Sequence, residues 1–114
     1  MKHILLYDSV FQFGWCLIVG GTEEQATKLL EKKFGFYFGE TRISNFSGFF
    51  AANATNRKQC AIWIENKKSL STMVHEATHA AIYVAEYLNL DVNYRNEVVS
   101  YYAEYLFKEL RKLK

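Results

Sequence analysis

Two histidines and a glutamate on one predicted helix are the residues of this sequence best suited to chemistry. They stand in the segment His75-Glu76-Ala77-Thr78-His79. Residues four apart lie on one helix face, one turn from each other, so both imidazoles can reach a single tetrahedral metal ion. Glu76 is rotated by about a quarter turn and can accept a proton from a metal-bound water without binding the metal. The segment thus matches the His-Glu-x-x-His motif.

The alternative reading of this segment is a pair of surface or core histidines beside a solvated glutamate. A projection of the helix at about 100° per residue tests it. One broad side carries the expected core contacts, which are Met73, Val74, Ala77, Ala81, Val84, Ala85 and Leu88. The other side carries His75, Glu76, His79, Ile82, Tyr83 and Glu86. Because the histidines lie outside the apolar stripe, core packing does not explain them, and the pattern favours a metal site.

A catalytic zinc ion takes a third protein ligand and keeps a position for water. Glu97 is the best candidate, because it lies in the first turn of the next predicted helix and a helical hairpin folds that turn back toward the first helix. Glu97 could instead merely stabilise the helix N-terminus. Glu86 shares the azimuth of His79 but lies about 10 Å along the axis, too far for the same ion. Asp91 could reach back only if its loop folded beneath the helix.

A family resemblance supports this ligand set. Residues 72–107, about a third of the chain, resemble the minimal gluzincin-type, zincin-like proteins of bacteria and phages, and faintly the ImmA/IrrE-like peptidases. The matching residues are His75, Glu76, His79, Ala80, Glu97, Tyr101, Tyr102, Ala103 and Leu106. The resemblance implies that His75, His79 and Glu97 bind Zn²⁺. It also implies that the strand at 60–64 guides an extended peptide substrate by β-augmentation.

The chain departs from that family at the groups that assist catalysis. Larger gluzincins have an aspartate four residues after the third ligand, and here that position is Tyr101. The hydroxyl of Tyr101 or of Ser100 could orient a ligand in its place. Tyr83, Tyr101, Tyr102 and Arg95 are the candidates for stabilising an oxyanion, although any one of these tyrosines could simply pack in the core.

These residues together predict a zinc-dependent, metallopeptidase-like hydrolase. Glu76 would act as general base and pass the proton to the leaving amine of a peptide or protein substrate. The alternative function is a non-catalytic zinc-binding interaction module, such as an accessory protein of a phage or mobile element. A third option, hydrolysis of a non-peptide amide, would require residues 35–59 to form a closed pocket.

The elements expected to position these residues form one α+β domain that spans residues 1–114. Strands are expected at 3–7, 13–19 and 60–64, and the stretch 35–59 is expected to hold short strands and turns. Helices are expected at 23–34, 71–88 and 94–112, the first opened by a capping box at Thr22 and Gln25. The sum is a small antiparallel or mixed sheet with one N-terminal helix, followed by a zincin-like helical hairpin that carries the ligands.

Composition and charge limit the kinds of partner and the location that we expect for the protein. The net charge of +2 is too balanced to predict nucleic-acid binding. No stretch approaches the ~20 apolar residues of a membrane span, and Asp8 interrupts the first apolar run too early for a signal peptide, so a cytoplasmic location is expected. Cys16 and Cys60 stand in apolar surroundings and are expected to be buried free thiols, with a disulfide left open. The oligomeric state is open as well.

Overall fold

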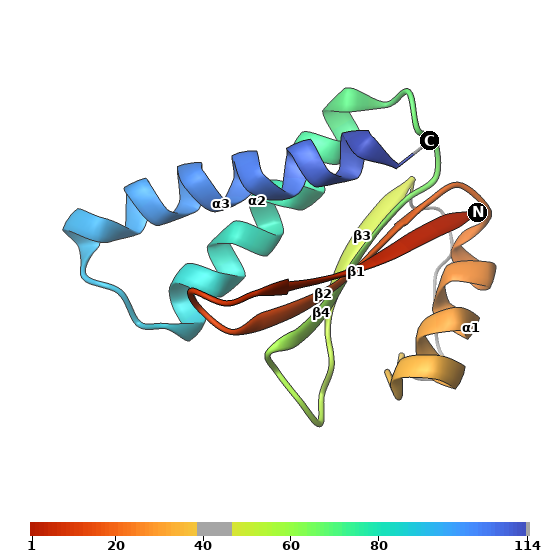
Figure 1. Cartoon of the computed structure of the whole chain (residues 1–114), viewed down its shortest axis with the longest axis horizontal. Coiled ribbons are helices and arrows are strands. Elements are labelled where there is room, and N and C mark those ends of the chain that lie inside the picture. Colours follow the sequence, from red (N-terminus) through yellow and green to blue (C-terminus); the bar gives the residue numbers. More distant parts are fainter. Residues whose placement is uncertain (39–46, 114) are drawn as a thin grey trace.

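A four-stranded mixed sheet forms the centre of the molecule. The computed structural model describes residues 1–38 and 47–113, with the backbone alone for residues 92 and 93. The strands are β1 (Lys2–Asp8), β2 (Phe13–Val19), β3 (Gly48–Ala52) and β4 (Gln59–Ile64), in the order β1-β2-β4-β3. β1 and β3 run antiparallel to their neighbours, whereas β2 and β4 are parallel (Figure 1). The predicted α+β class is confirmed, and of the two kinds of sheet that the sequence left open, antiparallel or mixed, the sheet is mixed.

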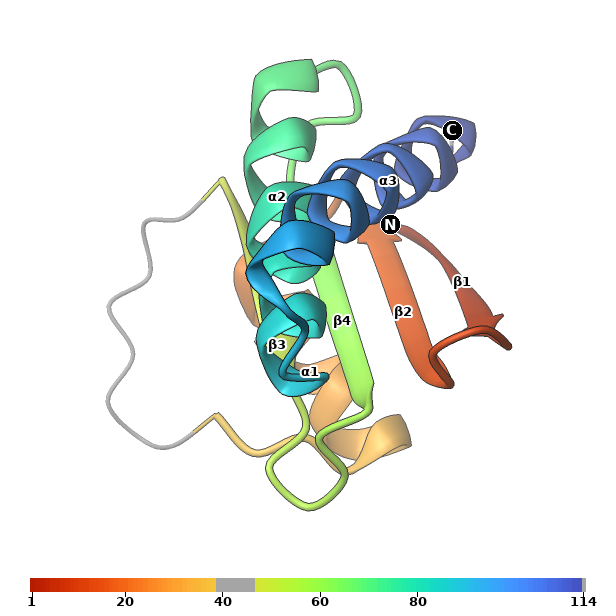
Figure 2. The ribbon, with the colours of Figure 1, turned by 90° about the vertical axis from the view of Figure 1, so that its left-hand side faces the viewer.

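In the described part of the chain, three helices cover the two faces of this sheet. They are α1 (Glu23–Phe34), α2 (Leu70–Tyr87) and α3 (Val92–Lys112). α1 lies on one face, while α2 and α3 pack against each other on the opposite face (Figures 1 and 2). Among the described residues, no helix has both the length and the apolarity that crossing a bilayer requires.

The two central strands are buried on both sides. Side chains alternate between the faces of a strand, and in β2 Trp15 and Leu17 pack toward α2 and α3, whereas Cys16 and Ile18 pack toward α1. This double burial explains why β2 reads as an almost continuous apolar run, because each face must meet a helix layer.

Both cysteines are buried free thiols, as predicted. Trp15 pairs with Cys60, and Cys16 pairs with Ala61, so the two sulfur atoms lie on opposite faces of neighbouring strands. Burial raises the pKa of each thiol to about 12. The register therefore excludes the disulfide that the sequence left open.

The capping box predicted for α1 is confirmed. The Gln25 amide donates to Thr22 Oγ1 at 3.1 Å, and the Thr22 amide donates to Gln25 Oε1 at 3.0 Å. The helix ends at Gly35, whose φ of 70° lies in the left-handed region that glycine adopts most easily. At the start of α2, Ser69 occupies the cap position, but its hydroxyl contacts Thr72 Oγ1 at 2.7 Å and makes no bond to the helix backbone.

Candidate metal centre

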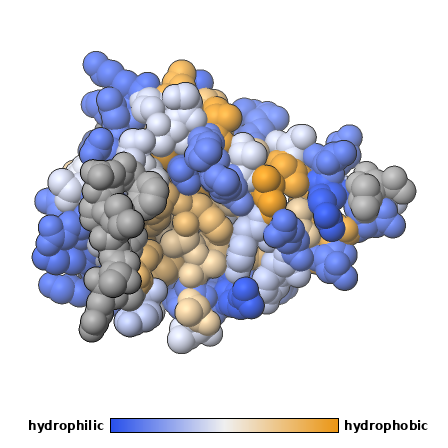
Figure 3. Space-filling model, turned by 180° about the vertical axis from the view of Figure 1, so that it is seen from behind, coloured by the Kyte–Doolittle hydropathy of each residue, from blue (hydrophilic) through white to orange (hydrophobic). Residues whose placement is uncertain are grey.

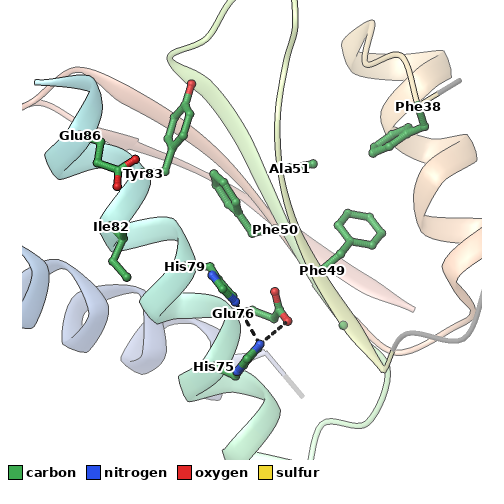
Figure 4. A pocket seen from close by; sticks show the side chains of 11 residues that line it. Phe38, Phe49, Phe50, Ala51, His75, Glu76, His79, Ile82, Tyr83 and Glu86 are labelled. Carbon is green, nitrogen blue, oxygen red and sulfur yellow. Dashed lines mark hydrogen bonds and ion pairs between the residues drawn. The ribbon is translucent and has the colours of Figure 1, made fainter.

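The two motif histidines meet on the exposed side of α2. Their Nε2 atoms lie 3.1 Å apart, and Figure 4 shows the two rings converging beside Glu76. Two nitrogens that bind one tetrahedral zinc ion at 2.0–2.1 Å are about 3.3 Å apart. The observed separation is within a few tenths of an ångström of that value, so this pair fits two corners of a zinc site.

The opposite side of α2 explains why the histidines face outward. Ala77, Ala80 and Ala81 are buried against the sheet, and their small side chains allow the helix to approach it closely. The predicted apolar stripe is thus largely confirmed. The exception is Val74, which is 49% exposed and borders a shallow apolar surface next to His75.

Glu76 is buried, contrary to its predicted place on the exposed side of the helix. Only 8% of the residue is accessible, because the start of β3 passes directly over it. Gly48 makes this approach possible: a Cβ atom there would lie 2.9 Å from Thr72 Cγ2 and from the Trp63 carbonyl oxygen, and 3.3 Å from Glu76 Cγ. The environment of this carboxyl is therefore set by β3, which covers it, and not by its position on α2 alone.

The electrostatics of Glu76 reflect this burial. Burial raises the pKa of the Glu76 carboxyl above its ordinary value, and the nearby His75 and His79 oppose that rise. Its Oε2 atom lies 3.9 Å from His75 Nε2, beyond hydrogen-bond distance. The carboxyl therefore stands next to the histidine pair as a separate group that can exchange a proton there.

A groove of about 660 Å³ runs between α2 and β3 past the histidines. Aromatic side chains form much of its wall, namely Phe38, Phe49, Phe50 and Tyr83. Figure 3 shows hydrophobic residues gathered in the middle of this face of the molecule, with hydrophilic residues around them. None of the described residues that line the groove is a lysine or arginine, and Glu86 stands at one end of it.

The outer edge of β3 borders this groove. Backbone hydrogen bonds at the two ends of the β3–β4 ladder join Asn53 to Gln59 and Glu65 to Ser47. Because bonded and non-bonded pairs alternate in an antiparallel ladder, the peptide groups of Phe50 face outward. Within residues 1–38 and 47–113, no strand pairs with this edge.

The prediction that the strand at 60–64 guides the substrate is wrong. Those residues belong to β4, which pairs with β2 on one side and β3 on the other and has no free edge. The strand that borders the histidines is β3, within the stretch 35–59 that the sequence left as short strands and turns. Residues 39–46 of that stretch lie outside the described residues.

The structure does not bring Glu97 to the histidines. Glu97 is exposed and lines a different pocket, between α3 and the β1–β2 turn. The buried face of α3 carries Leu106, and nine residues at about 100° each turn Glu97 to the opposite side of the helix. In the described part of the chain, no three His, Cys, Asp or Glu side chains are grouped to hold a metal ion. A helical hairpin sets how far along α3 Glu97 lies, but the side of the helix on which its side chain stands depends on the buried face of α3.

The tyrosines proposed as catalytic also lie outside the groove. Tyr102 is buried, and its hydroxyl accepts a hydrogen bond from Trp15 Nε1 and donates one to Asp8 Oδ2, both at 2.8 Å. Tyr101 is 71% exposed and lines the same pocket as Glu97. Of the residues considered for oxyanion stabilisation, Tyr83 alone lines the groove, and its hydroxyl donates to the Arg57 carbonyl at 2.6 Å.

Sequence reasoning missed the groove wall formed by Gly48, Phe49 and Phe50. A glycine followed by an apolar run of strand length was the available signal, since glycine in a strand often marks a close backbone approach. Comparisons of the chain with protein-family models, with curated proteins and with solved structures found no match.

Proposed function

We propose that the protein is a zinc-dependent hydrolase of peptide or amide bonds, with His75 and His79 as metal ligands and Glu76 as general base. The 3.1 Å separation of the two Nε2 atoms carries the proposal. An exposed pair of imidazoles at this distance on one helix face suits joint coordination. The pair supplies two of the three protein ligands that a catalytic zinc ion usually takes.

Glu76 has the place and chemistry of a proton shuttle. A bound zinc ion would lower the pKa of a water molecule toward ~7 and polarise the substrate carbonyl. Glu76 would take the proton from that water as it attacks the carbonyl carbon, and would deliver it to the nitrogen when the C–N bond breaks. Its burial favours this role, because a carboxyl of raised pKa releases and binds a proton nearer to neutral pH.

The groove suits an extended peptide. The outward peptide groups of Phe50 can pair with a substrate backbone by β-augmentation, while the phenylalanine rings around them provide apolar contact for alternate side chains. A peptide laid along β3 passes the histidine pair on α2. The substrate class we propose is therefore a peptide or protein segment with apolar side chains.

Metal content tests the first half of the proposal. Protein purified without added metal is expected to contain about one zinc per chain by mass spectrometry. The variants His75→Ala and His79→Ala should lose it, whereas His3→Ala should keep it, since His3 lies on β1 away from the groove. Glu97→Gln should also keep it, because Glu97 lines another pocket. A wild-type protein with no more zinc than the two alanine variants would exclude the site.

Hydrolysis tests the second half. Wild-type protein is incubated with a mixture of peptides that carry apolar residues, and products are identified by mass spectrometry. Glu76→Gln should lower the cleavage rate by about 10²- to 10⁴-fold, the usual contribution of a general base, while zinc stays bound.

One observation favours the alternative of a non-catalytic zinc-binding interaction module. Neither Tyr101 nor Tyr102 reaches the groove, and the Tyr83 hydroxyl is already bonded to a backbone carbonyl, so no tyrosine hydroxyl of the described groove is free to stabilise an oxyanion. The two functions differ in the same assay. A binding module retains zinc but shows no Glu76-dependent cleavage.

A further inference from the structure

A second pocket lies between α3 and the β1–β2 turn, away from the histidine groove between α2 and β3. Its volume is about 640 Å³, and it is lined by residues 7–11, at the end of β1 and in the turn that follows, and by α3 residues between 97 and 105. We call it the tyrosine pocket. It shares no lining residue with the histidine groove. Whatever it binds is therefore independent of the proposed metal site.

A carboxylate is held rigidly at the end of β1, where the turn begins. Asp8 Oδ1 accepts a hydrogen bond from the Val10 amide at 2.9 Å, and the Phe11 amide lies 3.3 Å from both carboxylate oxygens. The Tyr102 hydroxyl donates to Oδ2 and is fixed in turn by Trp15 Nε1. The two backbone amides and the Tyr102 hydroxyl all donate to the Asp8 carboxylate, so they hold it in one orientation.

A second carboxylate stands on the helical wall. Glu97 belongs to the first turns of α3 and is exposed. No lysine or arginine is among the described lining residues. The ammonium of Lys58 donates to the Phe11 carbonyl but packs over two rings outside the pocket. Two carboxylates therefore line the pocket, and none of its described lining residues is a cation that could pair with them.

Aromatic rings complete the walls. Tyr105 is half-buried and packs edge-on against Tyr102, with ring centroids 5.6 Å apart, and Tyr101 is 71% exposed. Ring faces beside carboxylates attract cations. A guanidinium group suits such a site better than an ammonium, because it is planar, stacks on rings and donates to carboxylates in a fork.

From these contacts we propose that the tyrosine pocket binds an arginine side chain of a partner protein. Val10 on the rim is 77% exposed, and with Tyr101 it extends the apolar surface beyond the space that one side chain fills. Tyrosine at a pocket rim is typical of protein interfaces, where an anchor such as arginine is surrounded by apolar contacts.

The test uses the full chain labelled with ¹⁵N and monitors amide shifts during titration. N-acetyl-arginine amide is expected to shift the amides of residues 8–11 and 97–105. N-acetyl-citrulline amide, which has the same shape without the charge, should leave these amides unshifted. A tripeptide with arginine between two leucines should bind more tightly than arginine amide alone, and added salt should weaken both.

Matched variants separate the pocket from the general surface. Glu97→Gln should weaken binding about threefold and Tyr101→Ala about two- to fivefold. Glu104→Gln and Tyr94→Ala alter exposed residues of the same helix that do not line the pocket, and they should bind as wild type does.

Three results would overturn the proposal. If the citrulline compound bound with the same affinity as the arginine compound, the charge of the guanidinium would not matter. If arginine amide and the tripeptide bound with the same affinity, the apolar surface around the pocket would not contribute, and a partner protein would no longer be supported as the occupant. Unmoved amides in a folded, well-dispersed spectrum would remove the site altogether. Zinc content and hydrolysis do not enter this test, so its failure leaves the proposed metal site unaffected.

Discussion

Replacing Gly48 by alanine is the sharpest test of how β3 and α2 hold the candidate metal centre together. The added Cβ atom would stand 2.9 Å from both Thr72 Cγ2 and the Trp63 carbonyl oxygen, closer than van der Waals contact allows. Trp63 is fully buried in a central strand, so its carbonyl cannot move aside. Thr72 can yield by rotating its side chain, which would disturb the 2.7 Å contact of its Oγ1 with the Ser69 hydroxyl, or by a shift of the first turn of α2.

The cost should be that of overpacking a tight core, about 1–3 kcal/mol. For a chain of this length, that corresponds to a fall in Tm of about 5–15 °C. Thermal unfolding followed by circular dichroism measures it. Adding Thr72→Ser removes the Cγ2 contact but not the carbonyl contact, so it should recover part of the loss.

Gly14→Ala is the matched control. Gly14 also lies in a strand, but a Cβ atom there meets nothing within 4 Å. Its stability should stay within about 0.5 kcal/mol of wild type or rise slightly, because alanine restricts the unfolded chain. If Gly48→Ala were as stable as Gly14→Ala, the close approach of β3 to α2 would be refuted.

Two further predictions concern buried titratable groups. Burial, the largest cause, raises the pKa of the Tyr102 hydroxyl above its ordinary value of 10.0, so the unfolded chain loses this proton first and stability falls as pH rises above 10. Tyr102→Phe should reduce that fall in the free energy of unfolding, measured by urea unfolding, by up to about 1.4 kcal/mol per pH unit, whereas Tyr101→Phe should not. Equal slopes of stability against pH in wild type and Tyr102→Phe would contradict this assignment. Cys16 and Cys60 should resist a thiol reagent at pH 8 in the folded protein and react at once in denaturant, and rapid labelling of the folded protein would show that these thiols are accessible.

Local patterns predicted the helices well. α1 begins and ends at the expected residues, because the capping box and the apolar spacing both act within a few residues of the chain. The expected bounds of α2 and α3 differ from the observed ones by one or two residues, as helix ends commonly do. Strands β1, β2 and β4 also match the predicted runs to within one residue.

Features set by distant parts of the chain were not predictable in the same way. The parallel pairing of β2 with β4 joins segments separated by α1 and β3, and no local pattern encodes it. The burial of Glu76 follows from a strand that sequence alone did not place. The direction of Glu97 is different: it could have been predicted, because a projection of α3 about Leu106 turns it away from the core.

The parallel β2–β4 pair also sets the order in which the sheet can assemble. The β1–β2 and β3–β4 hairpins each close over a short turn, but a parallel pair needs a long crossover, here through α1 and β3. Closing a longer loop costs more chain entropy before any contact compensates for it. We therefore expect the β2–β4 ladder to form last, when it joins the β1–β2 hairpin to the β3–β4 hairpin against which α2 and its two imidazoles pack.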